Sequence, residues 1–145
     1  MKRENRGTKI VRTLLAEQPI QINAYDIDAM GIVSNIVYVR WFEDLRMAFL
    51  NEHYPLAEMM AVQISPILMK TEIEYKAPLT IFDKPVGRCW MVKIGQSSWE
   101  MELEITTEKH IHCTGKQSGC FYHLEKKKVA KIPEPLKKLF ETSSK

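Results

Sequence analysis

The sequence YDIDAMGIVSNIVYVRWFEDLRMAFLNE, residues 25–52, decides the fold, because a polar turn passes directly into a segment with one bulky apolar face. From Asn35 to about Glu52 the apolar spacing predicts a single amphipathic helix. Ser34 or Asn35 is suited to cap it, since a short polar side chain there accepts a hydrogen bond from a free backbone N–H. One face carries Tyr38, Trp41, Phe42, Leu45, Ala48 and Phe49, and the opposite face carries Arg40, Glu43, Asp44 and Asn51.

Strands are predicted around this helix wherever apolar and polar residues alternate. They cover residues 19–24, 69–75, 86–94, 99–105 and 111–124, the last bent near Gly115 or Gly119. Residues 53–65 are expected to be a connection, and 133–140 a short helix. One helix followed by consecutive strands, without strand–helix alternation, favours an α+β fold. A single antiparallel sheet curled around the helix buries its apolar face.

Length and composition predict one globular domain over residues 1–145, with a basic N-terminal arm at 1–17 and a short helix and tail at 133–145. A net charge of +3 gives no indication of nucleic acid as a partner. No apolar run is long enough for a signal peptide or a membrane span, so we expect a cytoplasmic protein without membrane insertion. The three cysteines lack a paired spacing, which favours reduced thiols.

The residues before the helix are suited to chemistry at a carbonyl group. Asp26, Asp28 and Gly31 immediately precede the predicted helix start. Backbone N–H groups at a helix N-terminus stabilise negative charge that develops on an oxygen, and a nearby carboxylate acts as nucleophile or general base. The alternative is structural: both aspartates fix a turn and complement the helix dipole.

The string D-x-D-x-x-G-I-V, followed by Y-x-x-W-F-E-x-x-R, resembles the 4-hydroxybenzoyl-CoA thioesterase and YbgC-like group of hot-dog enzymes. The resemblance is strongest over residues 22–49 and is supported by Glu74-Tyr75-x-x-Pro78 and by Asp83. It implies a hot-dog fold, with one long central helix wrapped by a curved antiparallel sheet. It also implies a homodimer, or a homotetramer built from dimers, with active sites at the dimer interface.

Carried over by position, the resemblance makes Asp28 the catalytic carboxylate and the Asn35 backbone N–H the oxyanion donor, with Gly31 allowing close backbone approach. The expected reaction is hydrolysis of an acyl-CoA or acyl-carrier-protein thioester without a cofactor or metal. Relatives often have histidine where this chain has Ile32 and Asn35. A dehydratase and a non-catalytic acyl-binding module remain alternatives. The residues expected to bind substrate are Tyr25, Val33, Ser34, Tyr38 and Glu43.

Other residue clusters give weaker signals. Glu43 is the alternative carboxylate, although its helical position favours an exposed role with Arg46 available at i+3. Cysteines 89, 113 and 120 have no neighbouring base and are interpreted as buried small residues. Histidines 110, 112 and 123 have the wrong spacing to form a zinc site with Cys113 and Cys120. Phosphates of CoA are expected to contact basic residues such as Lys76, Arg88, Lys93 or Lys116. Methionines such as Met59, Met60 and Met69 are candidates to line an acyl tunnel, although flexible methionines more often belong to the ordinary core.

Overall fold

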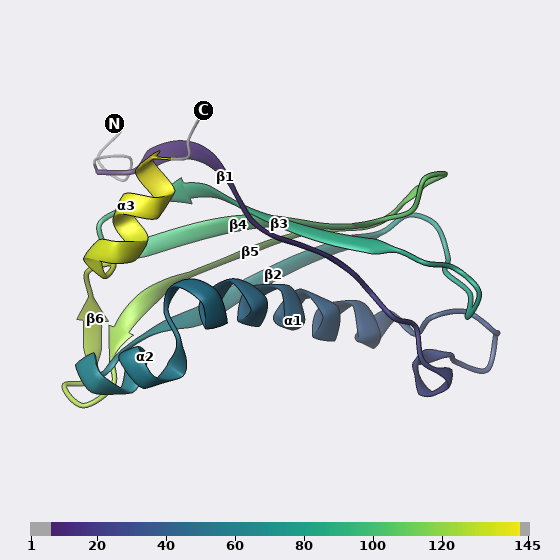
Figure 1. Ribbon diagram of the computed structural model, residues 1–145, viewed down its shortest axis with the longest axis horizontal. Coiled ribbons are helices and arrows are strands. Elements are labelled where there is room, and N and C mark those ends of the chain that lie inside the picture. The colour runs from purple at the N-terminus through teal and green to yellow at the C-terminus, as the bar shows by residue number, and fades with distance from the viewer. Residues whose placement is uncertain (1–6, 143–145) are drawn as a thin grey trace.

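The computed structural model describes residues 7–142 (Figure 1). A 3₁₀ turn at Ala24–Asp26 precedes the long helix α1 (Asn35–His53) and the short helix α2 (Leu56–Val62). Helix α3 (Glu134–Thr142) closes the described chain. The strands are β1 (Lys9–Pro19), β2 (Ile64–Tyr75), β3 (Val86–Ile94), β4 (Ser98–Thr106), β5 (Ile111–His123) and β6 (Lys128–Ala130).

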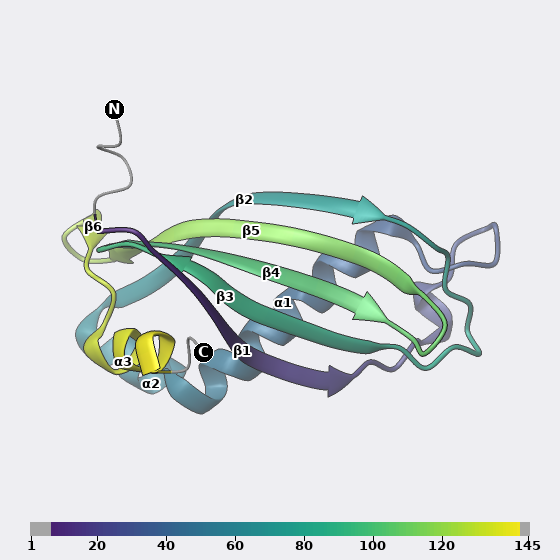
Figure 2. The same ribbon diagram turned by 90° about the horizontal axis from the view of Figure 1, so that it is seen from above.

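The strands form one antiparallel sheet in the order β1-β3-β4-β5-β2, with β6 paired to the end of β5. Viewed from above, β1 and β2 lie at opposite edges and α1 runs beneath the strands (Figure 2). The sheet curves over α1, with the loop before α1 at one end and α2 at the other (Figure 1). This arrangement confirms the predicted α+β hot-dog fold.

Helix α1 packs against the sheet through the predicted apolar face. Phe42 and Leu45 are fully buried, at 0% exposure, and Trp41 and Phe49 are buried beside them. A Cβ atom on Gly115 of β5 would collide with the Phe42 ring. Glycine at this position therefore allows the helix to lie close to the strand.

The first strand differs from its predicted position. Residues 20–23 form no ladder, although the Ile20 N–H donates to the Pro85 carbonyl at 2.9 Å. Strand β1 instead spans Lys9–Pro19 and pairs with β3 along its length. Residues 9–17 of the expected basic arm therefore belong to the sheet, and residues 1–6 lie outside the described part.

The remaining elements follow the predictions with two additions. Helix α2 occupies the segment expected to be a connection, with Pro55 at its N-cap. Strand β6 was not anticipated, and β2 begins earlier than predicted, at Ile64. The register shift of the β2–β5 ladder lies between Leu68 and Lys70, so the extra residue opposite Gly119 belongs to β2 and not, as predicted, to β5. Of the helices between residues 7 and 142, none is both long and apolar enough to cross a membrane.

Candidate active site

The loop before α1 is closed by Asp26. Its carboxylate is buried and accepts a hydrogen bond from the Asn23 N–H at 2.8 Å. Its backbone carbonyl accepts one from the Ser34 N–H at 2.9 Å. Ile27 and Val33 form an isolated antiparallel bridge, and the Val33 N–H donates to the Leu79 carbonyl at 2.9 Å. These bonds tie both ends of the loop together and to the following chain.

Asp28 lies at the exposed tip of this loop. Its Oδ1 accepts a hydrogen bond from the Met30 N–H at 2.8 Å and a longer one from the Ile32 N–H at 3.4 Å. Its Oδ2 has no hydrogen-bond partner within residues 7–142. Gly31 completes the turn with a φ of +83°, a conformation that residues with a side chain rarely adopt. One carboxylate oxygen is thus held by the backbone, and the other stays open.

The start of α1 leaves two backbone donors open. Ser34 occupies the N-cap position, but its side chain makes no capping bond, so the expected cap is absent. The Val37 N–H donates to the Ser34 carbonyl at 3.0 Å. The N–H groups of Asn35 and Ile36 have no acceptor among the described residues. Unpaired donors of this kind, at the positive end of a helix, are suited to bind an anionic oxygen.

Tyr75 is a site residue that the sequence-based list missed. Its hydroxyl donates to the Asn35 carbonyl at 3.0 Å. Its ring packs edge-on against Tyr38, 5.4 Å between centroids, and Tyr38 packs in turn against Trp41. Burial raises the pKa of Tyr38 to about 12, so its phenol stays protonated at neutral pH. The available signal was the position of Tyr75 inside the E-Y-x-x-P string.

The other predicted residues divide between surface and core. Tyr25 is 80% exposed at the start of the loop, whereas Val33 and Tyr38 are buried beneath it. Glu43 is exposed on α1, roughly 12 Å along the helix axis from Asn35 at about 1.5 Å per residue. The structure therefore gathers Tyr25, Asp28, Gly31, Ser34 and Asn35 around the start of α1, and leaves Glu43 apart from them.

A family model described as the thioesterase-like superfamily matches residues 22–140. The chain belongs to the thioesterase-like superfamily. The acyl-CoA thioester hydrolase YbgC of Escherichia coli is 30% identical over 74 residues, which cover 50% of this chain and 55% of YbgC. The chain thus spans about half the length of the curated relatives it matches.

Two solved structures share the fold of this superfamily member. Protein SAV2348 of Staphylococcus aureus, solved in complex with CoA, matches with a TM-score of 0.85 at 14% identity. The matched region covers 94% of this chain and 87% of the SAV2348 chain. The gentisyl-coenzyme A thioesterase BH1999 matches with a TM-score of 0.76 at 21% identity, and the matched region covers 86% of this chain and 99% of the BH1999 chain. At these identities the likeness concerns the fold alone.

Several polar residues of this thioesterase-like chain have structural roles. Both ring nitrogens of the buried His112 are engaged, Nδ1 with the Ala77 carbonyl at 3.0 Å and Nε2 with the Thr107 hydroxyl at 2.8 Å. Burial raises the pKa of the Cys89 and Cys113 thiols to about 12, which leaves almost no nucleophilic thiolate at neutral pH. Within residues 7–142 no three side chains are grouped to hold a metal ion.

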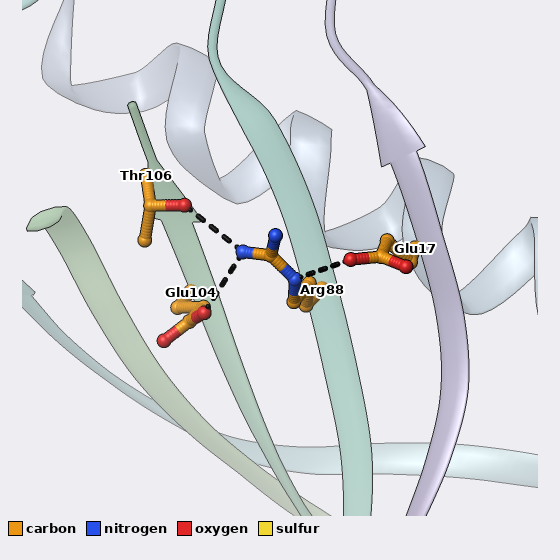
Figure 3. A network of polar contacts seen from close by, with 4 residues as sticks. All are labelled: Glu17, Arg88, Glu104 and Thr106. Atoms are coloured by element: carbon orange, nitrogen blue, oxygen red, sulfur yellow. Dashed lines mark hydrogen bonds and ion pairs between the residues drawn. The ribbon is translucent and has the colours of Figure 1, made fainter. Parts of the chain in front are cut away.

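Arg88, one of the basic residues considered for phosphate binding, is held by neighbours on the sheet (Figure 3). Its Nε donates to Glu17 at 2.6 Å, and its Nη1 donates to Glu104 at 3.2 Å and to Thr106 at 3.0 Å. Two carboxylates therefore neutralise its charge, and the bond to Glu17 is the main cause of its raised pKa. Arg88 stabilises the pairing of β1, β3 and β4.

Proposed function

We propose that this protein hydrolyses an acyl-CoA thioester to a free carboxylic acid and CoA, with Asp28 as the catalytic carboxylate. The observation that carries the proposal is the carboxylate at the loop tip, which is fixed through Oδ1 and open at Oδ2. Membership of the thioesterase-like superfamily supports the reaction class. The name of YbgC, an acyl-CoA thioester hydrolase, supports CoA as the carrier.

The reaction needs an attack on the thioester carbonyl carbon and a place for the resulting negative charge. In one route Oδ2 of Asp28 attacks directly, the C–S bond breaks, and water then cleaves the acyl anhydride and restores the carboxylate. In the other route Asp28 removes a proton from the attacking water. In both routes the Asn35 N–H donates to the oxyanion, the departing sulfur takes up a proton, and one water is consumed.

Release of free thiol from aromatic, short-chain and long-chain acyl-CoAs tests this proposal. The proteins are the wild type, Asp28→Asn and Asp44→Asn, which removes an exposed carboxylate of α1 away from the loop. We expect Asp28→Asn to lose about three orders of magnitude or more in kcat/KM, and Asp44→Asn to match the wild type. A wild type that retains acyl-CoA without turnover is a binding module, and an active Asp28→Asn variant removes Asp28 from the mechanism.

A dehydratase on this fold has less support. Such an enzyme needs a histidine beside Asp28 as the partner base. Among residues 7–142 no histidine makes a hydrogen bond to Asp28, and both ring nitrogens of His112 are engaged elsewhere. Hydrolysis by the open carboxylate needs no such partner.

The active protein is proposed to be a homodimer joined along the free edge of β2. Strand β2 pairs with β5 on one side, and no described strand covers its other side (Figure 2). Leu68 and Met69 on this strand are exposed, Met69 at 71%. A long exposed strand edge with apolar residues favours pairing with another chain. We expect sedimentation velocity to detect a dimer and Met69→Lys to shift it toward monomer; a wild type that stays monomeric contradicts this assembly.

A further inference from the structure

A phenol from the sheet reaches the start of α1 beside the proposed oxyanion donor. The Tyr75 hydroxyl donates to the Asn35 carbonyl at 3.0 Å, and it comes from the end of β2, 40 residues further along the chain. Two contacts hold Tyr75 there: it pairs with Cys113 in the β2–β5 ladder, and its ring packs edge-on against the Tyr38 ring. The phenol therefore meets the helix at a fixed point.

The bond from Tyr75 acts on a peptide group that carries an open donor. The Asn35 carbonyl shares its peptide group with the Ile36 N–H, and this N–H has no acceptor among the described residues. A hydrogen bond to a carbonyl oxygen draws electron density through the conjugated amide, which makes the N–H of the same peptide group a stronger donor. Tyr75 thus strengthens the Ile36 N–H without touching it.

The same bond stabilises the start of α1 and leaves its donors open. A side chain that caps a helix normally accepts from the second or third N–H, here that of Ile36 or Val37, and so occupies a donor. Ser34 makes no such bond. A carbonyl oxygen has two lone pairs, so the Asn35 carbonyl can accept the Tyr75 hydroxyl and also take part in the helix ladder. Tyr75 therefore holds the first turn from its carbonyl side.

We infer that Tyr75 is a positioning residue of the proposed site: it orients and polarises the Asn35–Ile36 peptide, so that the Ile36 N–H is a second oxyanion donor beside the Asn35 N–H. This role rests on the proposed function, because the oxyanion forms only during thioester hydrolysis. Burial raises the pKa of the Tyr75 phenol, mainly through desolvation, so the hydroxyl keeps its proton at neutral pH and remains a donor.

Thiol release by Tyr75→Phe and Tyr54→Phe tests this role. Tyr54 donates its hydroxyl to the Ile64 carbonyl, so both variants lose a bond of the same kind. Tyr54 is the C-cap of α1, roughly 28 Å along the helix from Asn35 at about 1.5 Å per residue. One oxyanion donor contributes about 10²–10³ to kcat, and a coupled hydrogen bond strengthens a donor by about 10–30%. Tyr75→Phe should therefore lower kcat about two- to eightfold with KM nearly unchanged, and Tyr54→Phe should keep both.

Fluorinated tyrosines at position 75 separate polarisation from packing. Monofluorotyrosine and difluorotyrosine keep the ring and the hydroxyl, and their phenols are more acidic and hence stronger donors. At a pH at which all of these phenols are protonated, kcat should rise in the order phenylalanine, tyrosine, monofluorotyrosine, difluorotyrosine. A side chain that only supported the fold would give the same kcat with all three hydroxyl-bearing residues.

Three results overturn the inferred role: wild-type kcat in Tyr75→Phe, equal losses of kcat in Tyr75→Phe and Tyr54→Phe, or a kcat that does not follow phenol acidity. Sedimentation velocity and urea unfolding show whether Tyr75→Phe keeps the assembly and cooperativity of the wild type, since Tyr75 lies on β2. If it does not, the fluorinated series decides, because every member of that series retains the hydroxyl.

NMR of the isotope-labelled full-length protein separates this role from the proposed hydrolysis, which fails if the wild type turns over no acyl-CoA. Tyr75→Phe should move the amide nitrogen signal of Ile36 upfield by more than that of Asn35, because only the Asn35–Ile36 peptide loses a bond to its carbonyl. A ketone analogue of octanoyl-CoA, with a methylene group in place of the sulfur, should move both amide proton signals of the wild type downfield. An unmoved Ile36 signal in either measurement overturns its assignment as a polarised second donor, whether or not thioesters are hydrolysed.

Discussion

Replacing Asn35 by proline removes the backbone N–H that is proposed to stabilise the oxyanion. Asn35 is the first residue of α1, a position where proline is favoured because its fixed φ suits the helix. Ser34 before it has a φ of −66° and a ψ of 142°, which proline tolerates in its preceding residue. The Asn35 carbonyl, which accepts the Tyr75 hydroxyl bond, is retained. The substitution therefore deletes the donor with little change to the fold.

The expected loss follows from the role of a single oxyanion donor. Removing one such donor lowers kcat by about 10²–10³, equivalent to roughly 2.7–4 kcal/mol of transition-state stabilisation. The donor acts on charge that develops during the reaction, so kcat should fall while KM changes little. Asn35→Ala keeps the N–H and removes only the side chain, which makes no hydrogen bond to the described residues. It should retain most of the activity.

Steady-state thiol release with the best acyl-CoA substrate gives kcat and KM for the three proteins. Circular dichroism and thermal unfolding show whether Asn35→Pro keeps the native helix content and cooperativity. A folded Asn35→Pro variant with wild-type kcat refutes the assignment of this N–H. Equal losses in Asn35→Pro and Asn35→Ala would instead assign the effect to the amide side chain.

Three further predictions concern packing, buried thiols and the helix start. Gly115→Ala should lower the free energy of unfolding by about 1–3 kcal/mol because the new methyl group meets the Phe42 ring. Urea unfolding should show a smaller loss from Gly115→Ala when Phe42→Leu is also present, and effects of the two substitutions that simply add contradict the contact. At pH 8, Ellman's reagent should modify Cys120 quickly and the buried Cys89 and Cys113 only after unfolding. Because the pKa of both buried thiols is raised from 9.0 to about 12, the unfolded chain loses these protons first, and stability should fall as pH rises from 9.0 toward 12. Tyr75→Phe should lower the free energy of unfolding by about 1 kcal/mol through loss of the bond to the Asn35 carbonyl, and an unchanged value means that this bond contributes nothing.

The central part of the fold could be predicted because its local patterns agree with its tertiary contacts. The apolar stripe of residues 35–52 corresponds to the buried face of α1. Strand β4 alternates apolar and acidic residues, and its apolar residues all point inward. In both elements one periodicity describes both the backbone and the burial, so the sequence alone identifies the element and its inner face.

Strand β1 could not be located in this way because apolar residues occur on both of its faces. Val11 and Leu15 point into the core, whereas Ile10 and Leu14 are exposed. Its strand conformation depends on pairing with β3, which lies far along the sequence. The contact between Arg46 and Gln117 has the same character, since it joins residues 71 positions apart. Such contacts have no local signature, and this one was therefore not predicted.

The structural interpretation of the aspartate pair before α1 applies to Asp26, and the catalytic one is proposed for Asp28. Asp26 follows the structural interpretation: its carboxylate is buried and closes the loop onto the Asn23 N–H. Asp28, two residues further along, is exposed at the tip of the same loop. The bonds made by Asp26 hold the loop against Ser34, and they thereby fix the position of Asp28 relative to the open donors of α1. A buried carboxylate that fixes the loop beside an open exposed one suits the catalytic role proposed for Asp28, since the first removes conformational freedom that the second would otherwise have to lose during the reaction.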